Sequence, residues 1–173
     1  MKLSKETKQL IRKEYEEFKE SMYAGKSLEE RQELDQFFTP PEVSIKLIEE
    51  LSDLSGNVLD PTSGSGNLLA AALIAGADSD KVFGNEYDAT MVKLCRERLN
   101  KVCDILGKPH IRDWQIHQGN ALIPDCLTEF GPEYDSTILS SLLKRRWGMS
   151  GGWMDNPEHY KEAEQLDLFG GLL

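Results

Sequence analysis

Apolar side chains recur at helical spacing near the start of the chain. Over residues 6–22 they fall on one face while charged side chains fill the other, which predicts an amphipathic helix. The apolar members are Leu10, Ile11, Tyr15, Phe18 and Met22. Ser27 and Glu30 have the spacing of a capping box and predict a second helix through Leu34. We expect residues 1–36 to form a helical extension over one edge of a core, with a partner-binding arm as the alternative.

The middle of the chain alternates short apolar runs with longer helical patterns. Three runs end in an acidic or polar residue and predict strands over residues 58–60, 81–86 and 114–118, and a fourth strand is predicted over residues 134–139. Helices are predicted over residues 40–51, 68–74 and 91–106. Strands that alternate with helices indicate an α/β fold with a Rossmann-like sheet and helices on both of its faces. We expect the first of these helices to pack on the sheet.

The first apolar run leads into a glycine-rich turn. Residues 58–67 read V-L-D-P-T-S-G-S-G-N, so that a strand ends at Asp60 and a helix follows the turn. Gly64 and Gly66 lack Cβ atoms, which lets the backbone turn tightly and approach a ligand. Strand, glycine loop and helix in that order are typical of a nucleotide site at the carboxyl end of a strand. A dinucleotide is a competing ligand for such a site.

Further polar positions fit the same edge of the sheet. Glu86 ends the second run 20 residues after Gly66 (86 − 66 = 20), the interval at which nucleotide folds place a carboxylate on ribose hydroxyls. The third run ends in Gly-Asn-Ala at residues 119–121. Upstream, Thr39 precedes a proline and Glu42 follows three positions later, which predicts a helix start with a threonine N-cap and a capping-box glutamate.

Four of these motifs resemble those of the adenine-N6 DNA methyltransferases, especially the modification subunits of type I restriction systems. Phe-Thr-Pro at residues 38–40 is similar to the motif that cradles the methionine end of S-adenosylmethionine in that family. Residues 60–66 are similar to its D-P-x-x-G-x-G loop, and Glu86 matches its ribose-binding acid. Residues 119–121 match G-D-A, with Asn120 in place of the acid.

The resemblance covers residues 36–139 and implies an S-adenosylmethionine-binding, Rossmann-like methyltransferase core over residues 37–143. The implied cofactor-binding residues are Phe38, Thr39, Pro40, Asp60, Thr62, Gly64, Gly66, Glu86, Asn120 and Ala121. The chemistry agrees, because a ribose diol donates to a carboxylate and the cofactor's own carboxylate suits backbone N–H groups at helix starts. The side-chain oxygen of Asn120 accepts the hydrogen bond that an acid would accept.

The family's catalytic tetrapeptide, Asn/Asp-Pro-Pro-Tyr/Phe, is absent from its expected place after the fourth run. Ser140 stands where the amide would be, followed by Ser141, Leu142 and, in the aromatic position, Leu143. Serine is a less polarising acceptor and leucine has no π-face, whereas base–aromatic stacking is worth about 1–3 kcal/mol per base. An Asn-Pro pair at residues 156–157 is a second candidate, but no apolar run precedes it. We therefore expect impaired catalysis.

The charge of the chain argues against tight, direct DNA binding. The net charge is −10, whereas affinity for DNA comes largely from lysine and arginine at phosphates. Lys144, Arg145 and Arg146 beside Trp147 are a local exception, either a solvated loop or a nucleic-acid contact. Residues 144–164 resemble a flexible linker in composition. The chain leaves no room for a target-recognition domain, so a second methyltransferase or specificity subunit is a candidate partner.

Cysteine and histidine positions predict no metal site. Cys95 and Cys103 fall on the apolar side of a predicted helix, Cys126 lies apart, and the chain has no C-x-x-C pair. We expect reduced cysteines in a cytoplasmic protein. No apolar run approaches the ~18 residues of a membrane span and no signal-peptide pattern is present, so we expect no membrane partner.

The chain ends in an apolar motif. Residues 165–169, Q-L-D-L-F, resemble the bacterial sliding-clamp-binding peptide Q-L-x-L-F. The implied clamp contacts are Gln165, Leu166, Leu168 and Phe169. The alternative is that the tail, residues 165–173, folds back on the core. Clamp binding would raise the local concentration of DNA around an acidic protein.

Three functions remain open on this evidence. The chain is an active adenine-N6 DNA methyltransferase that follows replication, or a cofactor-binding relative that serves as a partner subunit or interaction module, or a small-molecule methyltransferase. The Phe-Thr-Pro motif and the tail disfavour the third. The sequence favours a DNA adenine methyltransferase relative in which cofactor binding is retained and catalysis is impaired.

Overall fold

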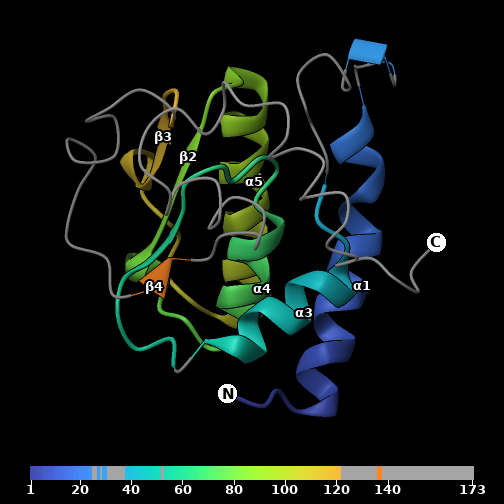
Figure 1. Cartoon of the computed structure of the whole chain (residues 1–173), viewed down its shortest axis with the longest axis vertical. Coiled ribbons are helices and arrows are strands. Elements are labelled where there is room, and N and C mark those ends of the chain that lie inside the picture. The colour runs from blue at the N-terminus through green and yellow to red at the C-terminus, as the bar shows by residue number, and fades with distance from the viewer. Residues whose placement is uncertain (25–26, 28, 31–37, 52, 122–135, 138–173) are drawn as a thin grey trace, which may run out of the picture. The chain divides into compact units, whose positions relative to one another are not determined.

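The described strands form one parallel sheet. Its described strands are β1 (Val58–Asp60), β2 (Val82–Glu86), β3 (Ile116–Gln118) and β4 (Ser136–Thr137). They lie in the order β3-β2-β1-β4, which is that of the first strands of a doubly wound sheet (Figure 1). The structure is a computed structural model that describes residues 1–24, 27, 29–30, 38–51, 53–121 and, by backbone alone, 136–137. The predicted Rossmann-like α/β class is confirmed.

Two of the strands begin later than the sequence pattern predicts. Lys81 belongs to a short 3-10 turn, η1 (Ser79–Lys81), and Trp114 to another, η2 (Asp113–Gln115). The side chain of Gln115 is buried and accepts a hydrogen bond from the Arg112 N–H at 2.8 Å, which closes the second turn. The predictions for β2 and β3 therefore began one and two residues too early, in turns that local hydrogen bonds hold.

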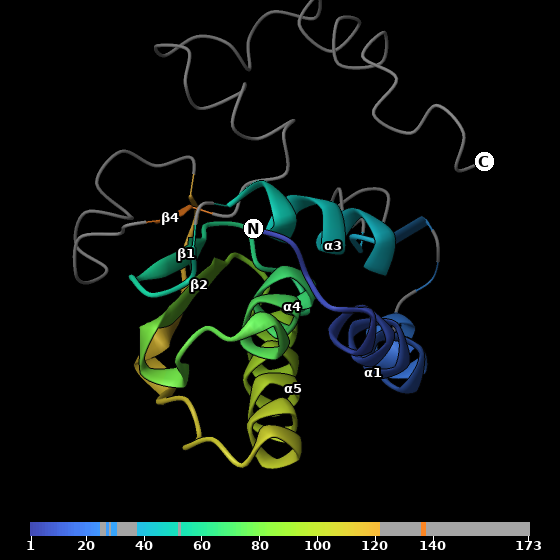
Figure 2. The ribbon, with the colours of Figure 1, turned by 90° about the horizontal axis from the view of Figure 1, so that it is seen from below.

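The described helices cover one face of the sheet, as Figure 2 shows. They are α1 (Lys5–Tyr23), α3 (Pro41–Glu50), α4 (Asn67–Ala75) and α5 (Ala89–Leu106). Helix α4 packs on β1 and β2 and is surrounded by α1, α3 and α5, so its residues 67–73 are all buried and the helix is apolar nearly all round. Within the described residues, helices on both faces of the sheet are not observed. The connection from β3 to β4, where a helix on the other face would fall, lies outside them.

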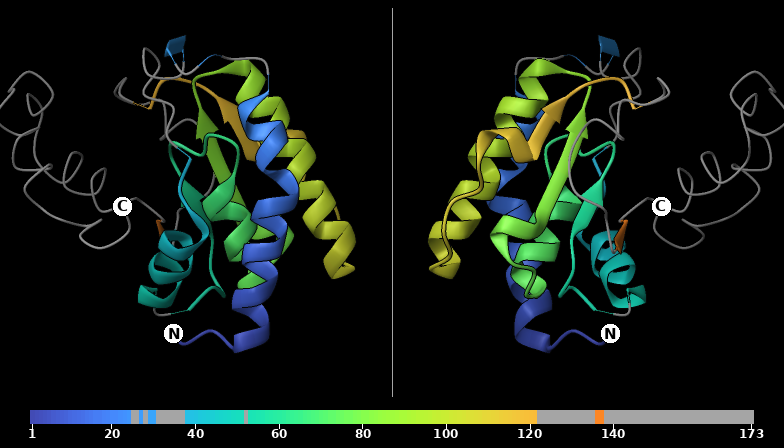
Figure 3. Two further views of the ribbon diagram at one scale, coloured as in Figure 1. Left: turned by 90° about the vertical axis from the view of Figure 1, so that its right-hand side faces the viewer. Right: turned by 90° about the vertical axis from the view of Figure 1, so that its left-hand side faces the viewer.

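Helix α1 confirms the predicted amphipathic helix. Ser4 caps it by accepting from the Thr7 N–H at 3.1 Å, and Ile11, Phe18 and Met22 are among its buried side chains. Both views in Figure 3 place α1 beside α5, and it also packs on α3 and α4. The second predicted helix is described only at residues 29–30, where the expected reciprocal capping bonds between Ser27 and Glu30 are present at 2.7 and 3.2 Å.

Two features of the predicted start of α3, the threonine N-cap and the capping-box glutamate, are wrong. Pro40 rather than Thr39 is the N-cap, and no side chain caps the helix. Glu42 does not fold back on the backbone, because its carboxylate pairs with the guanidinium of Arg12 on α1, at 2.6 and 3.1 Å. The helix also packs mainly on α4 and α1 rather than on the sheet.

Helix α5 carries the two described cysteines as predicted. Cys95 and Cys103 are free thiols and are fully buried in the main core together with Leu99 and Val102. Burial raises the pKa of the Cys95 thiol to about 12. A thiol in that environment packs as a small apolar group.

Several predicted functional residues lie outside the described part of the chain. These are Ser140, Ser141, Leu142 and Leu143, the cations Lys144, Arg145 and Arg146, and the tail residues Gln165, Leu166, Leu168 and Phe169. Among the described residues, no helix is long and apolar enough to cross a membrane.

Candidate functional site

The glycine turn after β1 adopts the backbone that its sequence predicts. Gly64 has φ +51° and Gly66 has φ +83°, both in the left-handed region that side chains other than glycine rarely enter. The Gly66 N–H donates to the Ser63 carbonyl at 2.7 Å, which closes the turn. A Cβ atom on Gly66 would lie only 2.8 Å from Sγ of Cys95, so the turn also lies directly on α5.

Glu86 at the end of β2 is tied to this turn. Its Oε2 accepts from the Gly64 N–H at 2.8 Å and its Oε1 accepts from the Asp88 N–H at 2.8 Å. Burial raises the pKa of the Glu86 carboxyl, although these two backbone N–H groups oppose the shift. A carboxylate offers about four lone-pair positions, so acceptor capacity for a ligand remains.

Asp60, at the end of β1, is the second buried acid at this edge. It is 3% exposed, and its Oδ1 accepts from the Thr62 N–H at 3.1 Å while the Thr62 side chain is exposed. Burial is the main cause that raises the pKa of Asp60 to about 7, and the nearby Glu86 adds to the shift. A carboxyl poised at neutral pH gains its negative charge when a cation approaches.

Asn85 joins the glycine turn to the end of β3. Its Nδ2 donates to the Pro61 carbonyl at 3.2 Å and to the Gly119 carbonyl at 3.0 Å. The Gly119 N–H in turn donates to the Glu86 carbonyl at 3.0 Å. These bonds bring residues 119–121, and with them Asn120 and Ala121, to the same edge as both acids.

The Phe-Thr-Pro segment meets the turn through its backbone. The Thr39 carbonyl accepts from Nδ2 of Asn67, the first residue of α4, at 2.9 Å. The Phe38 ring packs edge-on against Tyr23 of α1, with ring centroids 5.1 Å apart. Pro40 is exposed. The backbone of this segment is thus at the site, and its aromatic side chain anchors it to α1.

Seven of the ten predicted cofactor residues therefore lie at or just after the carboxyl ends of β1, β2 and β3, namely Asp60, Thr62, Gly64, Gly66, Glu86, Asn120 and Ala121. The other three, Phe38, Thr39 and Pro40, meet this edge through the Thr39 carbonyl, which accepts from Asn67. Sequence reasoning missed the buried residues that hold them there, Asn67, Asn85 and Arg98. The sequence did carry a signal for Asn85. It is a polar residue inside an apolar strand, directly before Glu86, and a buried polar side chain needs a hydrogen-bond partner. No group of three or more His, Cys, Asp or Glu side chains suited to a metal ion occurs among the described residues.

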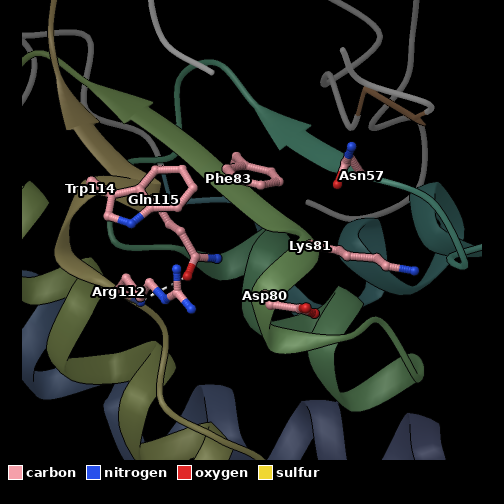
Figure 4. A pocket seen from close by; sticks show the side chains of 7 residues that line it. All are labelled: Asn57, Asp80, Lys81, Phe83, Arg112, Trp114 and Gln115. Atoms are coloured by element: carbon pink, nitrogen blue, oxygen red, sulfur yellow. Dashed lines mark hydrogen bonds between the residues drawn. The ribbon is translucent and has the colours of Figure 1, made fainter. Parts of the chain in front are cut away.

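A cavity of about 360 Å³ opens at the opposite, amino-terminal end of the strands (Figure 4). Its lining includes Phe83, Arg112, Trp114 and Gln115. In open parallel sheets ligands bind outside the carboxyl ends, beside the point where the winding reverses. The turn after β1 lies at that point, and the cavity does not. The turn therefore stands where a doubly wound sheet places its ligand.

The sequence profile of the N-6 DNA methylase family matches residues 8–130, more than half of the 173 residues. The chain belongs to the N-6 DNA methylase family. This match includes the glycine turn, both acids and residues 119–121.

A crystal structure of a protein from Pyrococcus horikoshii, provisionally described as an RNA methyltransferase, is similar to the chain at 22% identity with a TM-score of 0.49. The similarity covers 78% of this chain and 58% of that protein, so the chain spans little more than half of that length. No curated protein matches the chain.

Proposed function

We propose that the chain binds S-adenosylmethionine at the carboxyl ends of β1, β2 and β3. The observation that carries this proposal is the carboxylate of Glu86, which two backbone N–H groups hold in place against the left-handed turn at Gly64. A held carboxylate with lone pairs to spare is what a ribose diol requires. When bound, the cofactor supplies a methyl group on a cationic sulfonium.

The other residues of the edge fit the remaining groups of such a ligand. Asp60 is a buried acid whose negative charge a cation would stabilise. The backbone at Thr39 and the start of α4 suits the amino-acid part. Asn120 would accept from an adenine amino group. In this role Gly66 lets the turn lie close against α5, and Asn85 holds the end of β3 beside the turn.

We further propose that this chain alone transfers methyl groups poorly. Ser140–Leu143 replaces the tetrapeptide that accepts from the target amine and stacks on the adenine in the family. The loss of an activating acceptor and of stacking slows such a reaction by orders of magnitude, since ~1.4 kcal/mol is tenfold. A cofactor-binding partner subunit is the alternative role, in which another chain supplies those groups.

Isothermal titration with S-adenosylmethionine tests cofactor binding. Wild-type protein should release heat and saturate, and Glu86→Gln should weaken binding about tenfold or more, since hydrogen bonds to a charged group are worth about 1.5–3 kcal/mol. Glu97→Gln, an exposed acid on α5, is the matched control and should bind like wild type. Absence of heat at millimolar ligand would end the proposal.

Transfer of labelled methyl groups to unmethylated DNA tests the proposal that the chain alone methylates poorly. We expect little or no labelled adenine from the chain alone. Labelling at an ordinary enzymatic rate would show that Ser140, or the Asn-Pro pair at residues 156–157, performs the chemistry.

We also propose that residues 165–169 bind the sliding clamp and so bring this acidic chain to replicating DNA. The double change Leu168→Ala with Phe169→Ala should abolish retention on immobilised clamp, because both side chains are the proposed apolar anchors. Leu172→Ala with Leu173→Ala, in the same tail, should leave retention unchanged. Equal retention of both variants would refute the assignment.

A further inference from the structure

A charged pair lies buried between α1 and α5. Arg98 is 1% exposed, and its Nε and Nη2 donate to Oε1 and Oε2 of Glu14 at 2.7 and 2.6 Å. The Phe18 ring covers the guanidinium, and the distance from Cζ of Arg98 to the ring centroid is 4.9 Å. Burial of two charges costs desolvation that their attraction only partly offsets, so a pair of this kind does not by itself explain stability.

The third nitrogen of the same guanidinium reaches the glycine turn. Nη1 of Arg98 donates to Oδ1 of Asn67 and lies 3.4 Å from the Ser65 carbonyl. Helix α1 is therefore connected to the turn through one arginine, by contacts that span 84 and 31 residues of sequence.

The amide of Asn67 carries the connection onward. Its Oδ1 also accepts from the Ser65 hydroxyl at 3.2 Å, while its Nδ2 donates to the Thr39 carbonyl at 2.9 Å. Asn67 is 7% exposed, so water does not compete freely for these bonds. One side chain thus fixes the segment before α3 relative to the turn, and Arg98 fixes that side chain.

We infer that Asn67 is a positioning residue for the Phe-Thr-Pro backbone, and that α1 sets its orientation through Glu14 and Arg98. In this arrangement α1 belongs to the support of the site and is more than a cap over the core. The consequence for a ligand rests on the proposed function, because Thr39 is expected at the methionine end of the cofactor. Weakened positioning should then affect that end and spare the nucleoside end.

The variant Asn67→Asp separates the two sides of this connection. It keeps the shape and the oxygen that Arg98 and Ser65 use, and it replaces the donor to Thr39 by an oxygen. Glu14→Gln acts from the other end, because it removes the charge that orients Arg98. Arg12→Gln is the matched control, since the Arg12–Glu42 pair also joins α1 to α3 but is exposed.

Titrations with S-adenosylmethionine and with methylthioadenosine, which lacks the amino-acid part, give the decisive comparison. Asn67→Asp should weaken the affinity for S-adenosylmethionine about tenfold, the equivalent of one buried hydrogen bond. Its affinity for methylthioadenosine should stay within twofold of wild type. Glu14→Gln should show the same selectivity with a smaller factor, and Arg12→Gln should change neither. Equal losses for both ligands, or no loss, would overturn the inference.

Amide hydrogen exchange without ligand keeps the inference testable if wild-type protein binds neither compound. The amides of residues 42–44 at the start of α3 should exchange faster in Asn67→Asp than in Arg12→Gln, because the segment before them has lost its anchor. Unchanged exchange there would refute the positioning role. Failure of wild type to bind would refute only the proposed function.

Discussion

A buried side-chain amide lies at each end of the parallel sheet, and the two ends differ in what surrounds it. At the carboxyl end Asn85 donates to the loop carbonyls that follow β1 and β3. At the amino end Gln115 donates to the carbonyls of Ser79 and Val82, at 2.8 Å each. Each amide is 1% exposed and joins segments that are far apart in sequence.

The carboxyl end adds chemistry that the amino end lacks among the described residues. Asp60 and Glu86 are buried there beside two left-handed glycines, and burial raises the pKa of both acids. The amino end has the cavity and the exposed ring of Trp114, but its buried polar residues, Ser79 and Gln115, carry no charge, and the Gln115 amide bonds to backbone carbonyls. A buried amide therefore marks architecture at either end, and the two buried acids beside left-handed glycines are the reason that the ligand is proposed at the carboxyl end.

Gly66→Ala should have the largest effect on the carboxyl end, as a loss of unfolding free energy. The left-handed backbone costs a side chain about 1–2 kcal/mol, and overpacking of a Cβ 2.8 Å from Cys95 costs about 1–3 kcal/mol more. Chemical denaturation should show the sum as lost free energy of unfolding. Adding Cys95→Ala should recover the overpacking part alone.

Gly107→Ala is the control for that measurement. Gly107 also has a positive φ, +64°, but a Cβ there would meet nothing within 4 Å. It should cost only the backbone part, about 1–2 kcal/mol. Equal losses of unfolding free energy at the two glycines would show that the turn does not pack closely on α5.

Asn85→Ala and Gln115→Ala break the two amides one at a time. Each should cost about 1–3 kcal/mol of unfolding free energy, because buried carbonyls lose their donors. Only Asn85→Ala should weaken S-adenosylmethionine binding in titration. A binding loss from Gln115→Ala of the same size would place the ligand, or its control, at the other end.

The pH dependence of binding tests the charge of Asp60. Its folded pKa near 7 lies above the ordinary value, so its contribution to stability is complete below the unfolded pKa and is lost as pH rises through 7. A cationic ligand prefers the ionised form, so binding should tighten by about tenfold from pH 6 to pH 8. In Asp60→Asn, any pH dependence of binding that remains comes from titration of the ligand and of Glu86. An identical profile in both proteins would remove Asp60 from the site.

Trp114→Ala should have the smallest effect on binding. The ring is 52% exposed and packs beside Phe83 with centroids 5.8 Å apart, so its loss should cost about 1 kcal/mol of stability. Affinity for S-adenosylmethionine should stay within twofold. A large loss of affinity would favour the amino-end cavity as the binding site.

Much of the fold was predictable because its signals are local. The glycine turn needed left-handed residues and the sequence supplies glycines there; the apolar runs gave three strands within a few residues; and α1 followed its helical period. That Asp60, Glu86 and residues 119–121 lie at one edge was predictable too, since parallel strands place their carboxyl ends together.

Contacts between distant segments were not predictable from those signals. Thr39 and Glu42 have the spacing of a capping pair, but the carboxylate of Glu42 pairs with the guanidinium of Arg12, which lies 30 residues away. In the same way Glu14 and Arg98 look like ordinary surface charges on amphipathic helices, and they become a buried pair only when α1 packs on α5. Tertiary partners decide such positions, and a single sequence does not name them.

An NMR titration of the labelled protein with S-adenosylmethionine tests the central claim most directly. The account predicts that the amide signals of Gly64, Gly66 and Glu86 shift together and saturate with one dissociation constant. The indole signal of Trp114, at the other end of the strands, should stay in place. Shifts confined to Trp114 and its neighbours, or no shifts at millimolar ligand, would contradict the claim.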